Sequence, residues 1–303
     1  MTISPSNSFT DLNNRSFIAV SGQDAESFLQ SLITNDLTQL KINDVLYSCL
    51  LTPNGKFLYD FFVFKTSKRP DNYLIACEKE RRDDLIKKLK MYKLRSQVIL
   101  ALEDEIKLYY LWDHKTSIAS VKHFYQDPRS DELGFFYLNY CKDDIDLICR
   151  QHQLNMVSND AFEAYRLTNN LPDGSCDMEP QKADIQQFNL DLLHGISFTK
   201  GCFIGQEPLA RIHHRGLLKR RAFPVHVIEK ETRLSHGQEV SFENKNIGKI
   251  CSTNGQQAIA VLKIANLPST TPILNLSGYT DKIQYTRPKW LEEVINLSNV
   301  VCR

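Results

Sequence analysis

The chain has 303 residues, of which 42% are hydrophobic, 24% charged and 10% aromatic. At roughly 150 residues per domain this length predicts about two domains, and the composition excludes disordered, collagen-like and low-complexity proteins. The 37 Lys and Arg residues nearly balance the 36 Asp and Glu residues, which leaves a formal charge of +1. Such a chain has no overall field that attracts nucleic acid or an anionic membrane, so we expect neither as a partner.

Hydrophobic patterns in the first half of the chain alternate between helix and strand. Apolar residues at helical spacing predict a helix over residues 23–37. Two strand-like runs then flank Asn54-Gly55, a pair that tolerates the positive φ angles of a tight turn, and they predict a β-hairpin. Another strand leads into a charged helix over residues 78–94, and strand-like runs continue over residues 98–102, 106–112 and 134–138.

The second half of the chain changes character twice. Helices are expected over residues 143–152 and 159–168, whereas residues 172–185 are polar and aperiodic. That segment indicates a long connecting loop of the kind that often carries function. Beyond Arg221, short strand-like runs alternate with Gly, Asn and Pro, which is typical of a small antiparallel barrel or sandwich. We therefore expect a domain boundary near residue 220.

The sequence shows no signal for export, membrane insertion or a metal cage. Its first 20 residues lack the pattern of a secretory signal or of an Arg-rich mitochondrial presequence, and no stretch approaches the length of a membrane span. We therefore expect a cytoplasmic protein with reduced thiols and no membrane partner. The eight cysteines include no C-x-x-C pair and no zinc-finger spacing with His, so no resident metal is expected.

The clearest chemical signal lies in residues 195–216. Cys202 stands between Gly201 and Gly205, whose backbone freedom lets a ligand approach the main chain, and Lys200 precedes it by two residues. The dipole of a helix expected to follow and the ammonium of Lys200 both favour the thiolate form of Cys202. This cysteine is therefore either a nucleophile or soft-metal ligand, or a small residue in a tight turn.

The helix that follows is expected to begin near Gln206. Glu207 opposes the thiolate by its negative charge, but together with Gln206 it can pair with the donor edge of a heterocycle. Arg211 and Arg215 stand four residues apart and share a helix face that suits a carboxylate tail.

Residues 200–207, K-G-C-F-I-G-Q-E, resemble the signature of the YgfZ family. These are folate-binding proteins of iron–sulfur cluster assembly and repair, related to the aminomethyltransferase (T-protein) of the glycine cleavage system. Further segments resemble family motifs in the expected order: Gly22-Gln23-Asp24-Ala25, Thr34-Asn35-Asp36, Thr52-Pro53-Asn54-Gly55-Lys56 through Asp60, Tyr165-Arg166-Leu167, and Ala210-Arg211 with Arg215-Gly216.

This resemblance implies an α+β fold with two parts. Residues 1–220 would form two interleaved T-protein-like subdomains around a central channel that binds tetrahydrofolate, and residues 221–303 would form a small C-terminal antiparallel β-barrel. The resemblance also implies an accessory factor for assembly or repair of iron–sulfur cluster proteins, whose partners are folate and iron–sulfur client or assembly proteins. Cys202 would be the reactive residue, and folate would be bound by Asn35, Asp36, Asp60, Lys200, Gln206, Glu207 and Arg211.

The same residues leave three further functions open. A folate-dependent one-carbon (aminomethyl) transferase needs a base such as Asp60 or Glu207 near the folate, but the glutamate that aminomethyltransferases keep near the position of Thr168 is not found here. A cysteine hydrolase would pair Cys202 with one of the histidines at positions 194, 213 and 214. An interaction module would dock a scaffold through the barrel and the basic run Lys219-Arg220-Arg221.

Overall fold

The structure is a computed structural model that describes residues 6–66, 72–114, 118, 121–140, 144–229, 231–267, 273–277, 281–288 and 290–291. It divides into two compact units. The first unit comprises Met1–Asn54, Leu58–Ala161 and Leu193–Gln206, and the second comprises Gly55–Phe57, Phe162–Leu192 and Glu207–Arg303. Among the described residues, no helix is both long and apolar enough to cross a bilayer.

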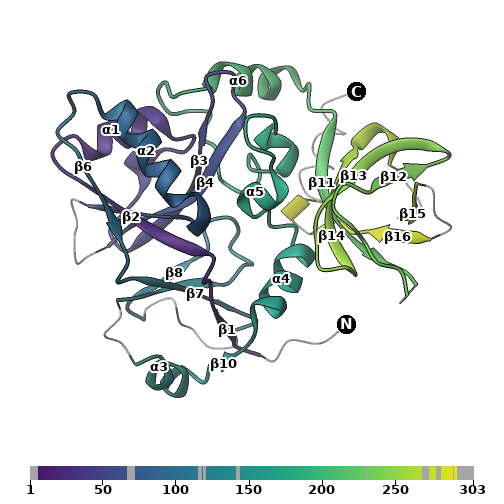
Figure 1. Cartoon of the computed structure of the whole chain (residues 1–303), viewed down its shortest axis with the longest axis horizontal. Helices are drawn as coiled ribbons and strands as arrows, with labels where there is room; N and C mark the ends of the chain where they lie inside the picture. Colours follow the sequence, from purple (N-terminus) through teal and green to yellow (C-terminus); the bar gives the residue numbers. More distant parts are fainter. Residues whose placement is uncertain are drawn as a thin grey trace. The chain divides into compact units, whose positions relative to one another are not determined.

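The first unit contains two five-stranded sheets (Figure 1). One sheet has the order β3 (Asp44–Leu51), β4 (Phe57–Lys65), β5 (Tyr73–Glu78), β2 (Arg15–Ser21) and β6 (Ile99–Glu103). The other has the order β10 (Asn155–Met156), β1 (Ser8–Asp11), β7 (Lys107–Trp112), β9 (Phe135–Asn139) and β8 (Phe124–Gln126). Only the short pairing of β1 with β10 is parallel in the second sheet.

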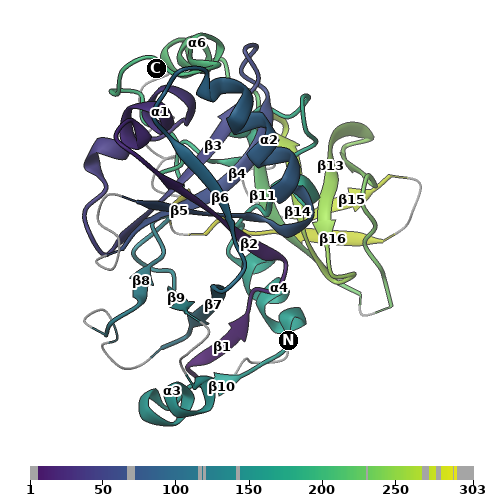
Figure 2. The same cartoon turned by 60° about the vertical axis from the view of Figure 1, so that its left-hand side comes forward.

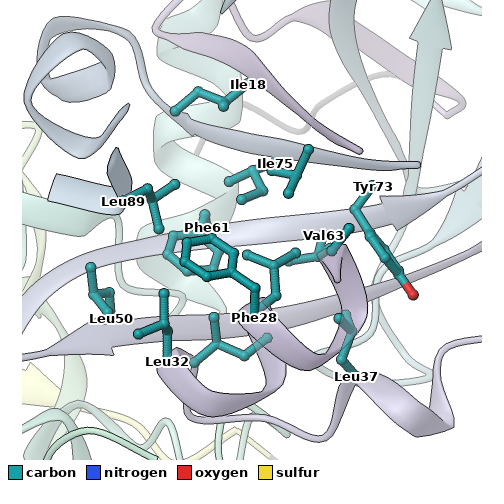
Figure 3. Packing of buried hydrophobic residues seen from close by; sticks show 14 of the residues in the cluster. Ile18, Phe28, Leu32, Leu37, Leu50, Phe61, Val63, Tyr73, Ile75 and Leu89 are labelled. Carbon is teal, nitrogen blue, oxygen red and sulfur yellow. The ribbon is translucent and has the colours of Figure 1, made fainter. Parts of the chain in front are cut away.

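Helices α1 (Ala25–Leu32) and α2 (Arg82–Lys93) cover one face of the first sheet. Figure 3 shows how Phe28 of α1 and Leu89 of α2 pack with Phe61 and Val63 of β4 in one buried cluster. Successive strand residues point to opposite faces, so Phe62 and Phe64 of the same strand point the other way.

The opposite face of the first sheet packs against the second sheet through aromatic rings. Phe62 and Phe136 lie 4.5 Å apart between ring centroids, and Phe64 contacts Tyr125 edge-on at 5.2 Å. Helix α3 (Ile145–His152) contributes Ile145 and Ile148 to a separate cluster on the far face of the second sheet (Figure 2). The apolar run Phe61–Phe64 within β4 is explained by burial of both faces of the strand.

The helix expected over residues 23–37 is shorter in the structure. α1 ends at Leu32, because the next residue, Ile33, has an extended backbone and forms an isolated antiparallel bridge with Leu50. The backbone N–H of Thr34 then donates to the carbonyl of Cys49, and a 3₁₀ turn follows over Leu37–Gln39. The apolar residues keep their helical spacing beyond Leu32, but from Ile33 onward the backbone forms hydrogen bonds with β3 instead of continuing the helix.

Other local expectations are confirmed. The charged helix forms as a 3₁₀ turn over Lys79–Arg81 followed by α2, and the hairpin joins β3 to β4, where Gly55 has a φ of 74° and Asn54 does not have a positive φ. α3 begins at Ile145, and residue 143 of the expected range lies outside the described residues.

The main part of the second unit begins within α4 (Asn159–Thr168), whose bounds match the expected helix. The expected loop over residues 172–185 is partly ordered as a single helical turn, α5 (Gly174–Asp177), and a 3₁₀ turn over Ile185–Phe188 follows it. Asp177 explains this order, because its carboxylate accepts hydrogen bonds from Arg166 of α4 at 2.9 Å and from the hydroxyl of Ser252 at 2.5 Å.

The C-terminal strands form the expected antiparallel barrel, which is closed. Between α6 (Gln206–Arg215) and the barrel the chain makes a short connection that starts with Gly216. A closed barrel leaves no unpaired sheet edge. Its strand order is β11 (Arg220–Val227), β14 (Gln257–Lys263), β13 (Lys245–Thr253), β12 (Glu239–Phe242), β15 (Ile273–Leu276) and β16 (Lys282–Tyr285), with a 3₁₀ turn over Ile264–Asn266.

Candidate functional site

Lys200 fixes the cysteine-bearing loop to the C-terminal end of α1. Its ammonium donates to the backbone carbonyls of Gln30 and Ile33 at 2.8 Å each and to that of Asn35 at 2.7 Å. The last carbonyls of a helix have no intrahelical partner and carry a partial negative charge, so a lysine satisfies them well. Burial of the ammonium lowers the pKa of Lys200 to about 8, against the opposing effect of the Asp36 carboxylate.

Asn35 and Asp36 shape the turn that Lys200 contacts. The amide nitrogen of Asn35 donates to the carbonyl of Tyr47 at 2.8 Å and to that of His194 at 2.7 Å. Asp36 accepts from the hydroxyl of Thr38 at 2.7 Å and from the amide of Gln30 at 2.8 Å. The hydrogen bond from Thr38 is the main reason that the pKa of Asp36 lies below its usual value.

Thr34 makes a second connection between the same two segments. Its hydroxyl donates to the carbonyl of Gly195 at 2.7 Å and accepts from the backbone N–H of Cys49 at 2.9 Å. The residues that follow α1 therefore join β3, the end of the helix and the segment that leads to Lys200.

Cys202 is exposed at the surface of the first unit, two residues beyond this buried anchor. The preceding Gly201 is also exposed, does not have a positive φ, and a Cβ placed on it would meet no atom within 4 Å. Gly205, by contrast, has a φ of 81°, which favours glycine. The loop therefore needs glycine for its own conformation at position 205 and not at position 201.

The expected effect of Lys200 on the cysteine takes a different form in the structure. The three hydrogens of the Lys200 ammonium match its three carbonyl acceptors, so this group holds the backbone of the loop. Within the described residues, no hydrogen bond or ion pair engages the Cys202 sulfur. The loop therefore fixes the position of the Cys202 thiol and leaves it exposed.

Asp60 lies in β4 on the face turned to the second sheet and is buried. The hydroxyl of Tyr47 donates to its carboxylate at 2.9 Å. Burial, followed by the charge of Asp60, raises the pKa of Tyr47 well above its usual value. Because the Tyr47 carbonyl accepts from Asn35, one residue of β3 links Asp60 to the anchor beside Cys202.

The structure thus brings some of the predicted site residues together. Asn35, Asp36 and Lys200 form one hydrogen-bonded group next to Cys202, and Asp60 joins it through Tyr47. The remaining three are on α6, where Gln206 is half-buried at the first position and Glu207 and Arg211 are exposed in the second unit.

A buried ion pair behind β3 and β4 was missed by sequence reasoning. Arg129 and Asp127 pair at 2.7 Å, and the hydroxyl of Tyr110 donates to the same carboxylate at 2.8 Å. The guanidinium lies 5.0 Å from the ring centroid of Phe62 and 5.7 Å from that of Tyr47. In the sequence this segment looks like a polar interruption between strands, and no local pattern indicates that it folds into the space between two sheets.

Comparisons with known proteins agree with this architecture. Residues 3–108 match the GCVT N-terminal domain family, and residues 219–293 match the CAF17 C-terminal beta-barrel domain family. The structure is similar to the crystal structure of the glycine cleavage system aminomethyltransferase T from Bartonella henselae. The TM-score is 0.70 at 16% identity, and the match covers 95% of this chain and 87% of the other.

The sequence is similar to iron–sulfur cluster assembly factors. It is 30% identical over 235 residues to the mitochondrial iron-sulfur cluster assembly factor IBA57 of Mus musculus, which covers 71% of this chain and 64% of that protein. It is 24% identical over 302 residues to the human IBA57, which covers 92% of this chain and 84% of that protein. The match to the Mycosarcoma maydis homologue covers 70% of this chain and 55% of that protein, so the chain spans less than two thirds of the mouse and Mycosarcoma relatives.

These relatives contradict the expectation of a cytoplasmic protein, because they are named as mitochondrial. Targeting segments are separate from the fold they deliver, so the folded part of a sequence does not indicate its compartment. The chain therefore combines a GCVT-like N-terminal domain with a CAF17-type C-terminal β-barrel, and its sequence is similar to that of the iron–sulfur cluster assembly factor IBA57.

Proposed function

We propose that this chain is an accessory factor for assembly or repair of iron–sulfur cluster proteins, that it is of the YgfZ type, and that Cys202 is its reactive residue. The observation that carries the proposal is an exposed thiol on a loop that Lys200 fixes to the end of α1. Thiolates are the usual protein ligands of iron–sulfur clusters. An exposed cysteine at a fixed position suits a brief contact with a cluster, its iron or a client protein, and the similarity to IBA57 supports this role.

We further propose that the chain binds a tetrahydrofolate. The likeness in fold to an aminomethyltransferase and the motif residues support this part. The side chains of Asn35, Asp36 and Lys200 already make hydrogen bonds within the protein. The groups on α6 remain available to a ligand: the amide of Gln206 and the carboxylate of Glu207 suit the donor edge of a pterin, and the Arg211 guanidinium suits a glutamate carboxylate.

Anaerobic titration calorimetry with tetrahydrofolate tests the folate proposal. We expect saturable binding that weakens about tenfold in Glu207→Gln and Arg211→Met, because each variant removes one charged contact. Binding that is absent in the wild-type chain, or unchanged in both variants, contradicts it.

Complementation tests the role of the thiol. In cells that lack the protein, Cys202→Ala should fail to restore the activity of [4Fe–4S] enzymes, whereas Cys176→Ala should restore it. Cys176 is a matched control, since it is also an exposed cysteine. Full restoration by Cys202→Ala would show that the sulfur at position 202 has no part in the function.

Neither a cysteine hydrolase nor a one-carbon transferase is favoured by a contact in the structure. Within the described residues, no histidine nitrogen is hydrogen-bonded to Cys202, as a cysteine hydrolase would require. A one-carbon transferase is distinguished by the formation of methylene-tetrahydrofolate from an amine donor, which the same anaerobic samples allow to be measured.

A further inference from the structure

The edge of the first sheet carries an apolar and cationic surface that the proposed site does not use. We define it as the α2–β6 surface, and it lies where the C-terminal end of α2 and the edge strand β6 are neighbours (Figures 1 and 2). Its members are Met91, Leu94, Ile99 and Leu102, with Lys90, Lys93 and Arg95.

Large apolar side chains are unusually exposed on this surface. Leu94 is 88% exposed, Met91 68%, Ile99 65% and Leu102 44%. Single exposed apolar residues are common on soluble proteins and need no explanation, but a group gathered within one short segment indicates a contact with another molecule.

Strand β6 adds an open hydrogen-bonding edge to these side chains. It pairs with β2 alone among the described strands, with Ile99 opposite Ser21 and Leu102 opposite Ile18. Its sequence, I-L-A-L-E, has no proline and no lysine, although such residues normally protect an edge strand. Leu100 and Leu102 share the face of the core cluster, while Ile99 points to the opposite face, so the edge is apolar on both sides.

The turn that leads into β6 contains a strained residue, Leu94. Leu94 has φ 46° and ψ −112°, a conformation that a bulky residue rarely adopts and that costs about 1–3 kcal/mol. Together with Asp24, Arg95 and Ser96 it lines a wide, open depression in the surface. The backbone of the turn is held there, since Asp24 accepts from the backbone N–H of Gln97 at 2.7 Å.

The charges indicate what kind of molecule fits. Within the described residues, Lys90, Lys93 and Arg95 form no ion pair, whereas Arg82 pairs with Asp104 near the other end of β6. The surface is therefore cationic at the Ile99 end of the strand. An extended segment with apolar residues and with acidic residues at that end would be complementary in shape and in charge.

We propose that β6 accepts an extended segment of a partner protein as an additional antiparallel or parallel strand. The apolar side chains of that segment pack on Met91, Leu94 and Ile99, and its acidic residues meet Lys90, Lys93 and Arg95. Among the described strands only β2 pairs with β6. An edge strand favours a protein strand over a membrane, because a lipid surface does not pair with backbone donors and acceptors. This inference depends on neither folate nor Cys202.

Fluorescence anisotropy with a designed probe tests the proposal on the full chain. The probe is a short labelled peptide of alternating Val and Thr with three Glu residues at one end, and its control has the same sequence except that the central Thr is replaced by Pro. We expect saturable binding of the first peptide and at least tenfold weaker binding of the second, because proline removes a strand hydrogen bond. Exchange of the β6 backbone amides with deuterium should slow only with the first peptide.

Two variants locate the binding. Ile99→Glu should weaken binding at least tenfold, and its exposed position makes it compatible with folding. The triple variant Lys90→Glu, Lys93→Glu, Arg95→Glu should do the same and should remove the salt dependence. The matched control is the double charge reversal Lys219→Glu, Arg220→Glu at the exposed start of the barrel, which should bind as the wild type does.

Several outcomes would overturn the proposal. Equal affinity for both peptides, affinity unchanged by both variants, or no saturable binding at all would do so. Binding of the chain to anionic phospholipid vesicles that the triple variant abolishes, without peptide binding, would assign the surface to a membrane. A dimer in sedimentation that Ile99→Glu dissociates would assign it to a second copy of the chain.

Discussion

Replacement of Gly201 by alanine separates the stability of the cysteine-bearing loop from its function. Gly201 has no positive φ, and an added Cβ meets no atom within 4 Å. Alanine at such a position stabilises a protein by about 0.4–1 kcal/mol, because it reduces the freedom of the unfolded chain. For a chain of this length that corresponds to a rise in Tm of about 1–4 °C. The added methyl group nevertheless occupies the space next to Cys202, so we expect weaker complementation of [4Fe–4S] enzyme activity.

Gly216 provides the matched control for this experiment. It is also exposed, and a Cβ placed on it also meets no atom within 4 Å, but its φ is 59°. Gly216→Ala should therefore lower the free energy of unfolding by about 1 kcal/mol, opposite in sign to Gly201→Ala. Urea unfolding followed by circular dichroism measures both. A Gly201→Ala protein that is stable and complements fully would show that nothing approaches Cys202 through this space, and a destabilised one would refute the loop conformation.

Three further predictions concern buried and paired charges. Lys200 has a folded pKa of about 8 against its usual 10.5, so the unfolded chain holds more protons between these values. The free energy of unfolding should therefore rise with pH across this window relative to Lys200→Met, and urea titrations of both proteins that run parallel would contradict this sign. Asp127→Asn leaves the Arg129 guanidinium buried without its carboxylate and should lower the free energy of unfolding by about 3–5 kcal/mol, whereas a loss below about 1 kcal/mol would show that the pair is solvated. Hydrogen bonds, above all that from Thr38, lower the pKa of Asp36 below 3.8. Its ionised carboxylate therefore adds to the free energy of unfolding above pH 3.8, and this contribution is lost as the pH falls further. In Asp36→Asn the free energy of unfolding should decrease less steeply with falling pH in the same urea titrations.

The elements that the sequence predicts best are those whose signal is local. The bounds of α4 and the hairpin around Gly55 follow from helical spacing and from turn residues within a few positions. The barrel follows from short strand-like runs that are separated by Gly, Asn and Pro. The end of α1 does not follow in this way. Ile33 continues the helical spacing, but its bridge to Leu50 is a contact across 17 residues that no local pattern contains.

The site shows the same division between local and distant information. The motif resemblance points to Lys200 and Asn35, but the hydrogen bonds that join their two segments depend on the fold that brings positions 30–36 and 194–200 together. Asp177 could not be recognised from the sequence either, since its partners Arg166 and Ser252 lie on either side of it at distances of 11 and 75 residues.

The partners of Lys200 explain why a short motif suffices to specify this loop. All three acceptors are backbone carbonyls in the last turn of α1 or just after it, so the anchor depends on the path of the backbone at Gln30, Ile33 and Asn35 and on no particular side chain as acceptor. A lysine on the loop and a helix that ends there are enough to define where the next residues lie. The acceptors, the lysine and the cysteine all belong to the first unit. Lys200→Met removes the three hydrogen bonds that fix the loop, so it should change the rate at which a thiol reagent modifies Cys202.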